Sequence, residues 1–169
     1  MPTLAGILAG LIVTLSGFIY DMPAAPAAPL GALPGLQKVF AGTPGSVGLE
    51  QGALSPCPAS PNCVVSQTSD SEHAIAPISY QASREDAYDA LVKILSVVPR
   101  TTIVEQTNDY IWAESSSRLL GFVDDVEFYF PSDENVIHMR SASRLGESDL
   151  GVNRRRLEQI RLAAQDLGL

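Results

Sequence analysis

The densest group of side chains that could bind a ligand lies near the C-terminus, in the sequence SDLGVNRRR at residues 148–156. Ser148 or Asp149 is placed to cap a helix that starts here, and the backbone N–H groups of residues 151–153 point out of its first turn. Arginines beside a helix start favour the binding of a phosphate, a carboxylate or a lipid head group. The residues expected to surround such an anion are Arg140, Arg144, Asp149, Asn153, Arg154 and Arg155.

The same arginines have a second interpretation, in which they pair with acids of the chain itself. Asp124, Asp125 and Glu127 lie close together in the sequence and are able to neutralise this positive charge. Both interpretations remain open at this level.

Catalytic chemistry has weaker support, and no catalytic residue is assigned. The sequence has no G-x-S-x-G, H-E-x-x-H or glycine-rich phosphate-binding motif. An acid–base pair of His138 with Glu127 or Asp125 is conceivable, with Glu114 nearby. This arrangement would suit a small hydrolase or isomerase, which is the alternative to a noncatalytic binding or assembly module.

Cys57 and Cys63 are the only cysteines, in the segment CPASPNC. Their spacing favours a disulfide in an oxidising compartment. A metal site with His73 as third ligand and a pair of reactive thiols are the alternatives. The spacing matches no standard zinc pattern and is not the C-x-x-C of a redox pair, so no metal or cofactor is expected.

The composition restricts the partners of the protein. The chain has 169 residues, with 19 acidic and 11 basic side chains and a net charge of −8. Nucleic-acid binding needs a basic surface, so a nucleic-acid partner is not expected.

The N-terminal part predicts an exported protein. Residues 4–20 carry no charge, which is typical of a membrane anchor or a signal segment, although a buried core helix remains an alternative. Residues 22–55 are rich in Pro, Ala and Gly, which indicates a flexible linker. We expect a membrane anchor or signal segment at residues 1–21, a flexible linker at 22–55 and one globular domain at 56–169. The domain is expected in the periplasm or the thylakoid lumen. The expected partners are the membrane and an anionic small molecule or membrane protein.

The elements of the domain follow from periodicity. Alternation predicts an edge strand at 73–80, and strands at 101–106, 110–117, 122–130 and 135–143. Helical spacing predicts a helix that Ser83 caps and Pro99 ends, and a second helix at 151–166. The order β-α-β-β-β-β-α indicates an α+β fold, with an antiparallel sheet of four to five strands and two helices on one face.

Alternation also sorts side chains between the two faces of the sheet. One set is apolar and should face the helices: Ile111, Ala113, Phe122, Val126, Phe128, Ile137 and Met139. The opposite set is polar and aromatic and is either a ligand-binding face or an ordinary solvated one: Tyr110, Trp112, Glu114, Asp125, Glu127, Tyr129, His138 and Arg140. Asp124 falls among the apolar set, so we expect an arginine from the C-terminal run to pair with it.

Three segments carry a resemblance to a known family: CPASPNCVVSQ (57–67), FVDDVEFYF (122–130) and RSASRLGESDLGVNRRR (140–156). In these the chain resembles the bacterial and chloroplast proteins grouped as domain of unknown function 1499, over about residues 56–167. The resemblance implies an exported or membrane-associated α+β domain. It implies no activity, and no catalytic residues carry over from it.

Overall fold

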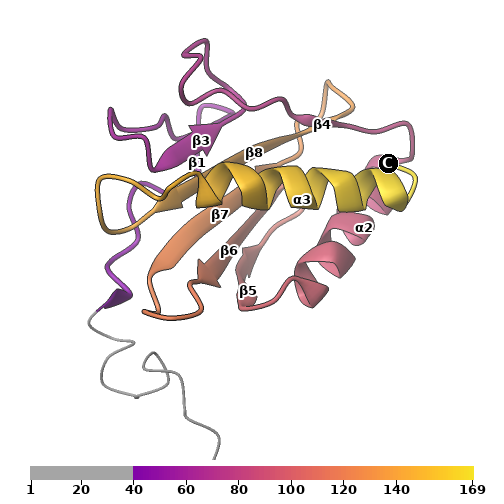
Figure 1. Cartoon of the computed structure of the whole chain (residues 1–169). Coiled ribbons are helices and arrows are strands. Elements are labelled where there is room, and N and C mark those ends of the chain that lie inside the picture. Colours follow the sequence, from indigo (N-terminus) through magenta and orange to yellow (C-terminus); the bar gives the residue numbers. More distant parts are fainter. Residues whose placement is uncertain (1–39) are drawn as a thin grey trace, which may run out of the picture.

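The computed structural model describes residues 40–169 (Figure 1). The expected anchor or signal segment, and the part of the expected linker before residue 40, lie outside the described residues. Within residues 40–169, no helix has both the length and the apolar character needed to cross a membrane.

An antiparallel sheet of six strands forms the centre of the domain. Its main path runs β3–β8–β7–β6–β5, and β4 pairs with β8 beside β3. The strands are β3 (Cys63–Val65), β4 (Ile78–Ser79), β5 (Thr101–Gln106), β6 (Tyr110–Ser116), β7 (Val123–Tyr129) and β8 (Val136–Ser143). The α+β class with an antiparallel sheet and two helices is therefore confirmed.

The two helices are α2 (Arg84–Val97) and α3 (Val152–Asp166). Figure 1 shows both on the same side of the sheet, with α3 crossing above β8 and α2 beside β5. Ser83 caps α2 as expected, because its Oγ accepts a hydrogen bond from the N–H of Asp86 at 3.1 Å.

The main core lies between the helices and the sheet. Every apolar side chain that alternation assigned to this face is buried there except Phe122, which precedes β7 and is only partly buried. Leu91, Ile94, Leu157 and Ile160 supply the helical side of this core.

The opposite face of the sheet is covered as well. β1 (Leu49–Glu50) and β2 (Ala53–Leu54) form a hairpin, and β2 contacts β7 and β8. Leu54 packs with Val65 and Tyr110 in a second, smaller core. Residues 40–55 thus belong to the folded domain, which corrects the expected domain start at residue 56 and the expected linker over this stretch. The composition of this glycine-rich stretch concealed its folding, because it packs on the sheet through only a few apolar side chains such as Leu54.

The first strands also differ from expectation. β3 was not predicted, because three residues are too few to show an alternating pattern. The predicted strand at 73–80 is reduced to β4, while Ala74 forms an isolated bridge with Val65. Pro77 lies between these two contacts and has no N–H to donate, so a continuous strand cannot form there.

Candidate functional site

The polar face of the sheet carries three cross-strand rows of side chains. Register places Trp112 opposite Glu127, and Glu127 opposite Arg140. One neighbouring row joins Tyr110, Tyr129 and His138, and the other joins Glu114 and Asp125. Alternation correctly predicted that all eight of these side chains share one face.

Glu127 is the centre of this face, and its side chain is fully buried. One carboxylate oxygen, Oε1, accepts hydrogen bonds from the Tyr110 hydroxyl and from the N–H of Gly48, both at 2.8 Å. The other, Oε2, accepts from Arg140 Nη1 at 2.7 Å. Burial and the adjacent carboxylate raise the pKa of the Tyr110 hydroxyl far above its usual value, so this hydroxyl remains a donor.

A second ion-pair group lies at the next row. Arg144 donates to both oxygens of Asp125 and also to Glu114 Oε1. Trp112 Nε1 donates to Asp125 Oδ1 at 2.9 Å. The side chains of Arg144 and Asp125 are 5% and 3% exposed, so the bonds between them are shielded from water, whereas the Glu114 side chain is 36% exposed.

These contacts leave little of the polar face for a substrate. Glu127, the acid of the hydrolase or isomerase alternative, already accepts three hydrogen bonds and lies beneath residues 48–54. His138 is half-buried, its Nδ1 lies 3.1 Å from Ser66 Oγ, and its burial lowers its pKa. Arg140 and Arg144 therefore pair with acidic residues of the chain itself, as the second interpretation of the arginines predicted.

The start of α3 is also capped from within the chain. Asp149 Oδ1 accepts from the N–H of Gly151 at 2.9 Å, and Oδ2 accepts from the N–H of Asn153 at 2.7 Å. The carboxylate of Asp149 thus accepts from the same N–H groups that an external anion at this helix start would use. Asn153 itself is fully buried and bonds Ser141, Ser143 and the carbonyl of Asn62.

The three consecutive arginines of α3 have different surroundings. Arg154 donates to the carbonyls of Ala74 and Glu72, in the loop beneath the helix. Arg156 forms the expected pair with Asp124, with Nη2 and Oδ2 2.6 Å apart. Arg155 is exposed and donates through Nη1 to the carbonyl of Leu150.

A cleft of about 420 Å³ opens beside Arg155 and Arg156. It lies between the first turns of α3, the end of α2 and the end of the β5–β6 hairpin. We call it the arginine cleft. Its polar lining consists of Arg100, Arg118, Arg155, Arg156, Asp124, Gln159 and three consecutive serines, Ser115, Ser116 and Ser117. Four arginines and a single carboxylate thus line this cleft, although the chain as a whole has a net charge of −8.

Several N–H groups of the arginine cleft are available to a ligand. Within residues 40–169, Arg118 forms no hydrogen bond or ion pair, and Arg100 donates only through Nε, to the carbonyl of Ser116. Arg100 has a φ of 57°, in the left-handed region that is uncommon for a residue with a side chain. A cationic cleft of this size suits an anion that accepts several hydrogen bonds at once.

The family model described as "Protein of unknown function (DUF1499)" matches residues 53–163. The chain belongs to this family. Neither a curated protein nor a solved structure matches the chain. The matched range includes all six strands of the central sheet, together with β2 of the separate hairpin and all four arginines of the arginine cleft.

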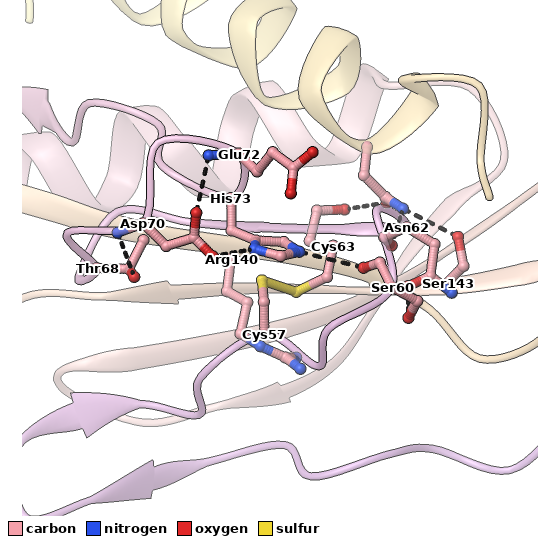
Figure 2. The surroundings of a disulfide bond; sticks show 12 residues. Cys57, Ser60, Asn62, Cys63, Thr68, Asp70, Glu72, His73, Arg140 and Ser143 are labelled. Atoms are coloured by element: carbon pink, nitrogen blue, oxygen red, sulfur yellow. Dashed lines mark hydrogen bonds and ion pairs between the residues drawn. A yellow bond between two sulfur atoms is a disulfide. The ribbon is translucent and has the colours of Figure 1, made fainter. Parts of the chain in front are cut away.

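The disulfide of the DUF1499 domain is formed as expected between Cys57 and Cys63. Figure 2 shows the loop that follows it, where His73 lies between Asp70 and the carbonyl of Ser60. The hydrogen bond to Asp70 raises the pKa of His73. Within the described part of the chain, no three His, Cys, Asp or Glu side chains are grouped to hold a metal ion.

The structure separates the predicted site residues of the DUF1499 domain into two places. One group shares the covered sheet face: Trp112, Glu114, Glu127, Arg140 and Arg144. The other lies at the start of α3: Asp149, Asn153, Arg154 and Arg155. Of these nine residues only Arg155 lines the arginine cleft.

Sequence reasoning missed Arg100 and Arg118 as members of a site. Antiparallel pairing sets Thr101 opposite Ser115, so residues that flank this pair meet at one end of the sheet. The predicted hairpin of 101–106 with 110–117 already carried that signal.

Proposed function

We propose that this DUF1499 domain is a noncatalytic binding module, which holds an anionic ligand in the arginine cleft on the outer side of a membrane. The observation that carries the proposal is the convergence of four arginines from three parts of the chain on one cleft with a single carboxylate. An acidic protein has no general electrostatic reason to gather cations in this way.

The hydrogen-bonding capacity of the cleft supports this proposal. Arg156 is held by Asp124, Ser141 and Asn153, so it serves as a fixed wall. Arg118 and the unused N–H groups of Arg100 and Arg155 remain as donors, with the hydroxyl of Ser117 close to them. Charge-assisted hydrogen bonds from guanidinium groups are well matched to phosphate and carboxylate oxygens.

Two features support the location. Disulfides persist in oxidising compartments, and Cys57 and Cys63 are joined by one. The uncharged residues 4–20 have the composition of an anchor or signal segment.

The test is a calorimetric titration of the full-length chain, purified from an oxidising compartment, with ethyl phosphate as the probe. We expect saturable binding, and we expect Arg118→Gln or Arg100→Gln to weaken it about tenfold, the effect of losing one charge-assisted hydrogen bond.

The matched control is Arg161→Gln, which removes the same charge from α3 at a position where Arg161 pairs with Glu158. This control should bind like the parent. Absence of saturable binding, or equal weakening in the cleft variants and the control, would refute the proposal.

A further inference from the structure

A second cleft adjoins the arginine cleft, and the two share Ser117, Asp124 and Val152 in their walls. Its volume is about 240 Å³, and Phe122, Leu145 and Leu150 line it together with Val152. We call it the apolar cleft. Its walls come from the loop after β6 and the loop between β8 and α3. The change from four arginines to four apolar side chains occurs across the shared wall.

The apolar side chains here are unusually exposed. Leu150 is 84% exposed, Leu145 42% and Val152 40%. Leu119 and Leu120, in the loop that follows Arg118, are 65% and 44% exposed. Of the nine large exposed apolar residues of the described chain, four therefore lie in the two loops beside these clefts, and a fifth, Val152, is the first residue of α3. Exposed apolar groups that gather in one place indicate a binding surface.

The backbone at Leu150 supports the same conclusion. Its φ of 54° lies in the left-handed region, where a leucine is unfavourable and asparagine or glycine is preferred. Arg100, on the other side of the paired clefts, has a φ of 57°. Such conformations are unfavourable and are concentrated at active sites and ligand-binding sites. These two unfavourable backbone conformations place Leu150 in the wall of the apolar cleft and Arg100 in the wall of the arginine cleft.

The described chain also enters the domain at this place. Phe40, its first described residue, packs against Phe122 with ring centroids 5.3 Å apart. Gly42 lies so close to Leu145 that an added Cβ would meet Leu145 Cγ at 3.0 Å. The uncharged residues 4–20 precede this entry point by about twenty residues.

We infer that the ligand is a single-chain anionic amphiphile, whose head group binds in the arginine cleft and whose hydrocarbon tail lies in the apolar cleft. This inference rests on the proposed function and adds the chemical class of the ligand. Charge complementarity assigns the anionic head to the four arginines, and the adjoining apolar walls assign the tail. A single molecule fits better than a bilayer surface, because the polar donors lie within a concave cleft.

The test compares two probes with the same head group on the full-length chain: ethyl phosphate, and decyl phosphate below its micelle concentration. We expect decyl phosphate to bind at least about tenfold more tightly, because burial of only two methylene groups has an effect of this size.

The decisive variant is Leu150→Asn, which removes the apolar side chain and suits the left-handed backbone, so the fold should be retained. We expect it to reduce the affinity ratio of the two probes about threefold or more. The matched control is Leu162→Asn on α3, where the leucine is 58% exposed and lines neither cleft. It should keep the parent ratio.

Failure of this inference alone gives a different result from failure of the proposed function. If neither probe binds, both fail. If both bind equally, the binding module stands and the amphiphile is refuted. If the tail strengthens binding equally in Leu150→Asn and in the control, the tail lies elsewhere and the inference is wrong. Binding to phosphatidylglycerol vesicles without binding of monomeric decyl phosphate would instead indicate a membrane-docking surface and would overturn it.

Discussion

Buried charge dominates the domain at the scale of single residues. Glu127 and Arg140 have side chains that are 0% and 6% exposed, and each is the principal compensation for the charge of the other. Removing one partner of such a pair leaves an uncompensated charge in a medium of low dielectric constant. The arrangement therefore holds the sheet face together without being available to a substrate.

We predict that Glu127→Gln lowers the free energy of unfolding by about 3–5 kcal/mol, because Arg140 loses its counter-charge. Urea denaturation measures this value. Glu158→Gln is the control, since Glu158 is 47% exposed and should contribute less than about 1 kcal/mol. Equal losses in the two variants would show that the burial of Glu127 has no energetic consequence.

The two histidines should act on stability with opposite sign. The hydrogen bond to Asp70 raises the pKa of His73 above 6.5, so its stabilising contribution is present below pH 6.5 and is lost as the pH rises through the folded pKa. Burial lowers the pKa of His138 below 6.5, so stability is lost as the pH falls from 6.5 through its folded pKa. His73→Gln should remove the loss on the alkaline side, and His138→Gln the loss on the acidic side.

Urea denaturation at a series of pH values, with NMR titration of both imidazoles, tests these signs. A pKa of His73 below that of His138 would contradict the assignment. Neighbouring carboxylates also act on both histidines. The charge of Glu72 further raises the pKa of His73, and the charge of Glu134 partly offsets the lowering of the His138 pKa by burial.

At the scale of elements, the start of α3 explains how the two clefts obtain their walls. Gly151 has a φ of 75° and turns the chain into the helix, while Asp149 satisfies the N–H groups of residues 151 and 153. This cap holds the loop before α3 in place. It therefore positions Leu150 and Arg155 on either side of the wall that separates the apolar cleft from the arginine cleft.

Asp149→Ala should cost about 1 kcal/mol of unfolding free energy, the usual effect of losing a helix cap. Ser148→Ala is the control, because Ser148 accepts only a long bond of 3.4 Å from Leu150. Urea denaturation of both variants decides the point. If Ser148→Ala proved the more costly, the assignment of the cap to Asp149 would be wrong.

At the scale of the whole molecule, the sheet is buried on both faces by different means. The helices cover one face with a continuous apolar core, whereas residues 40–57 cover the other through a small core and the hydrogen bond from Gly48 to Glu127. The disulfide lies where this cover joins β3.

Removal of the cover should therefore destabilise the domain. We predict that the free energy of unfolding is about 3 kcal/mol lower for a chain that begins at residue 56 than for one that begins at residue 40. The shorter chain loses the burial of Leu54 and one hydrogen bond to a buried charge. Urea denaturation of both truncated chains gives the difference. Equal stability would mean that residues 40–55 add nothing to the fold.

Sequence alone determined the features that depend on neighbours along the chain. Alternation assigned the side chains of β6, β7 and β8 to their faces, and helical spacing with Ser83 and Pro99 located α2. The cysteine spacing predicted the disulfide, and the parity of Asp124 predicted an arginine partner, which is Arg156. In each case the decisive interaction is encoded in periodicity, capping or local charge.

Only the tertiary structure decided which polar groups satisfy one another and which remain available. Gly48 and Glu127 are 79 positions apart, and no local sequence pattern predicts the hydrogen bond between them. Arg100, Arg118 and Arg155 belong to three separate segments, so their common cleft is a product of packing rather than of a motif. The contiguous run of arginines was the stronger signal in the sequence, yet the free donors lie where distant segments meet. The physical reason is that a buried polar group must find its partner in space, and the fold alone sets which partner that is.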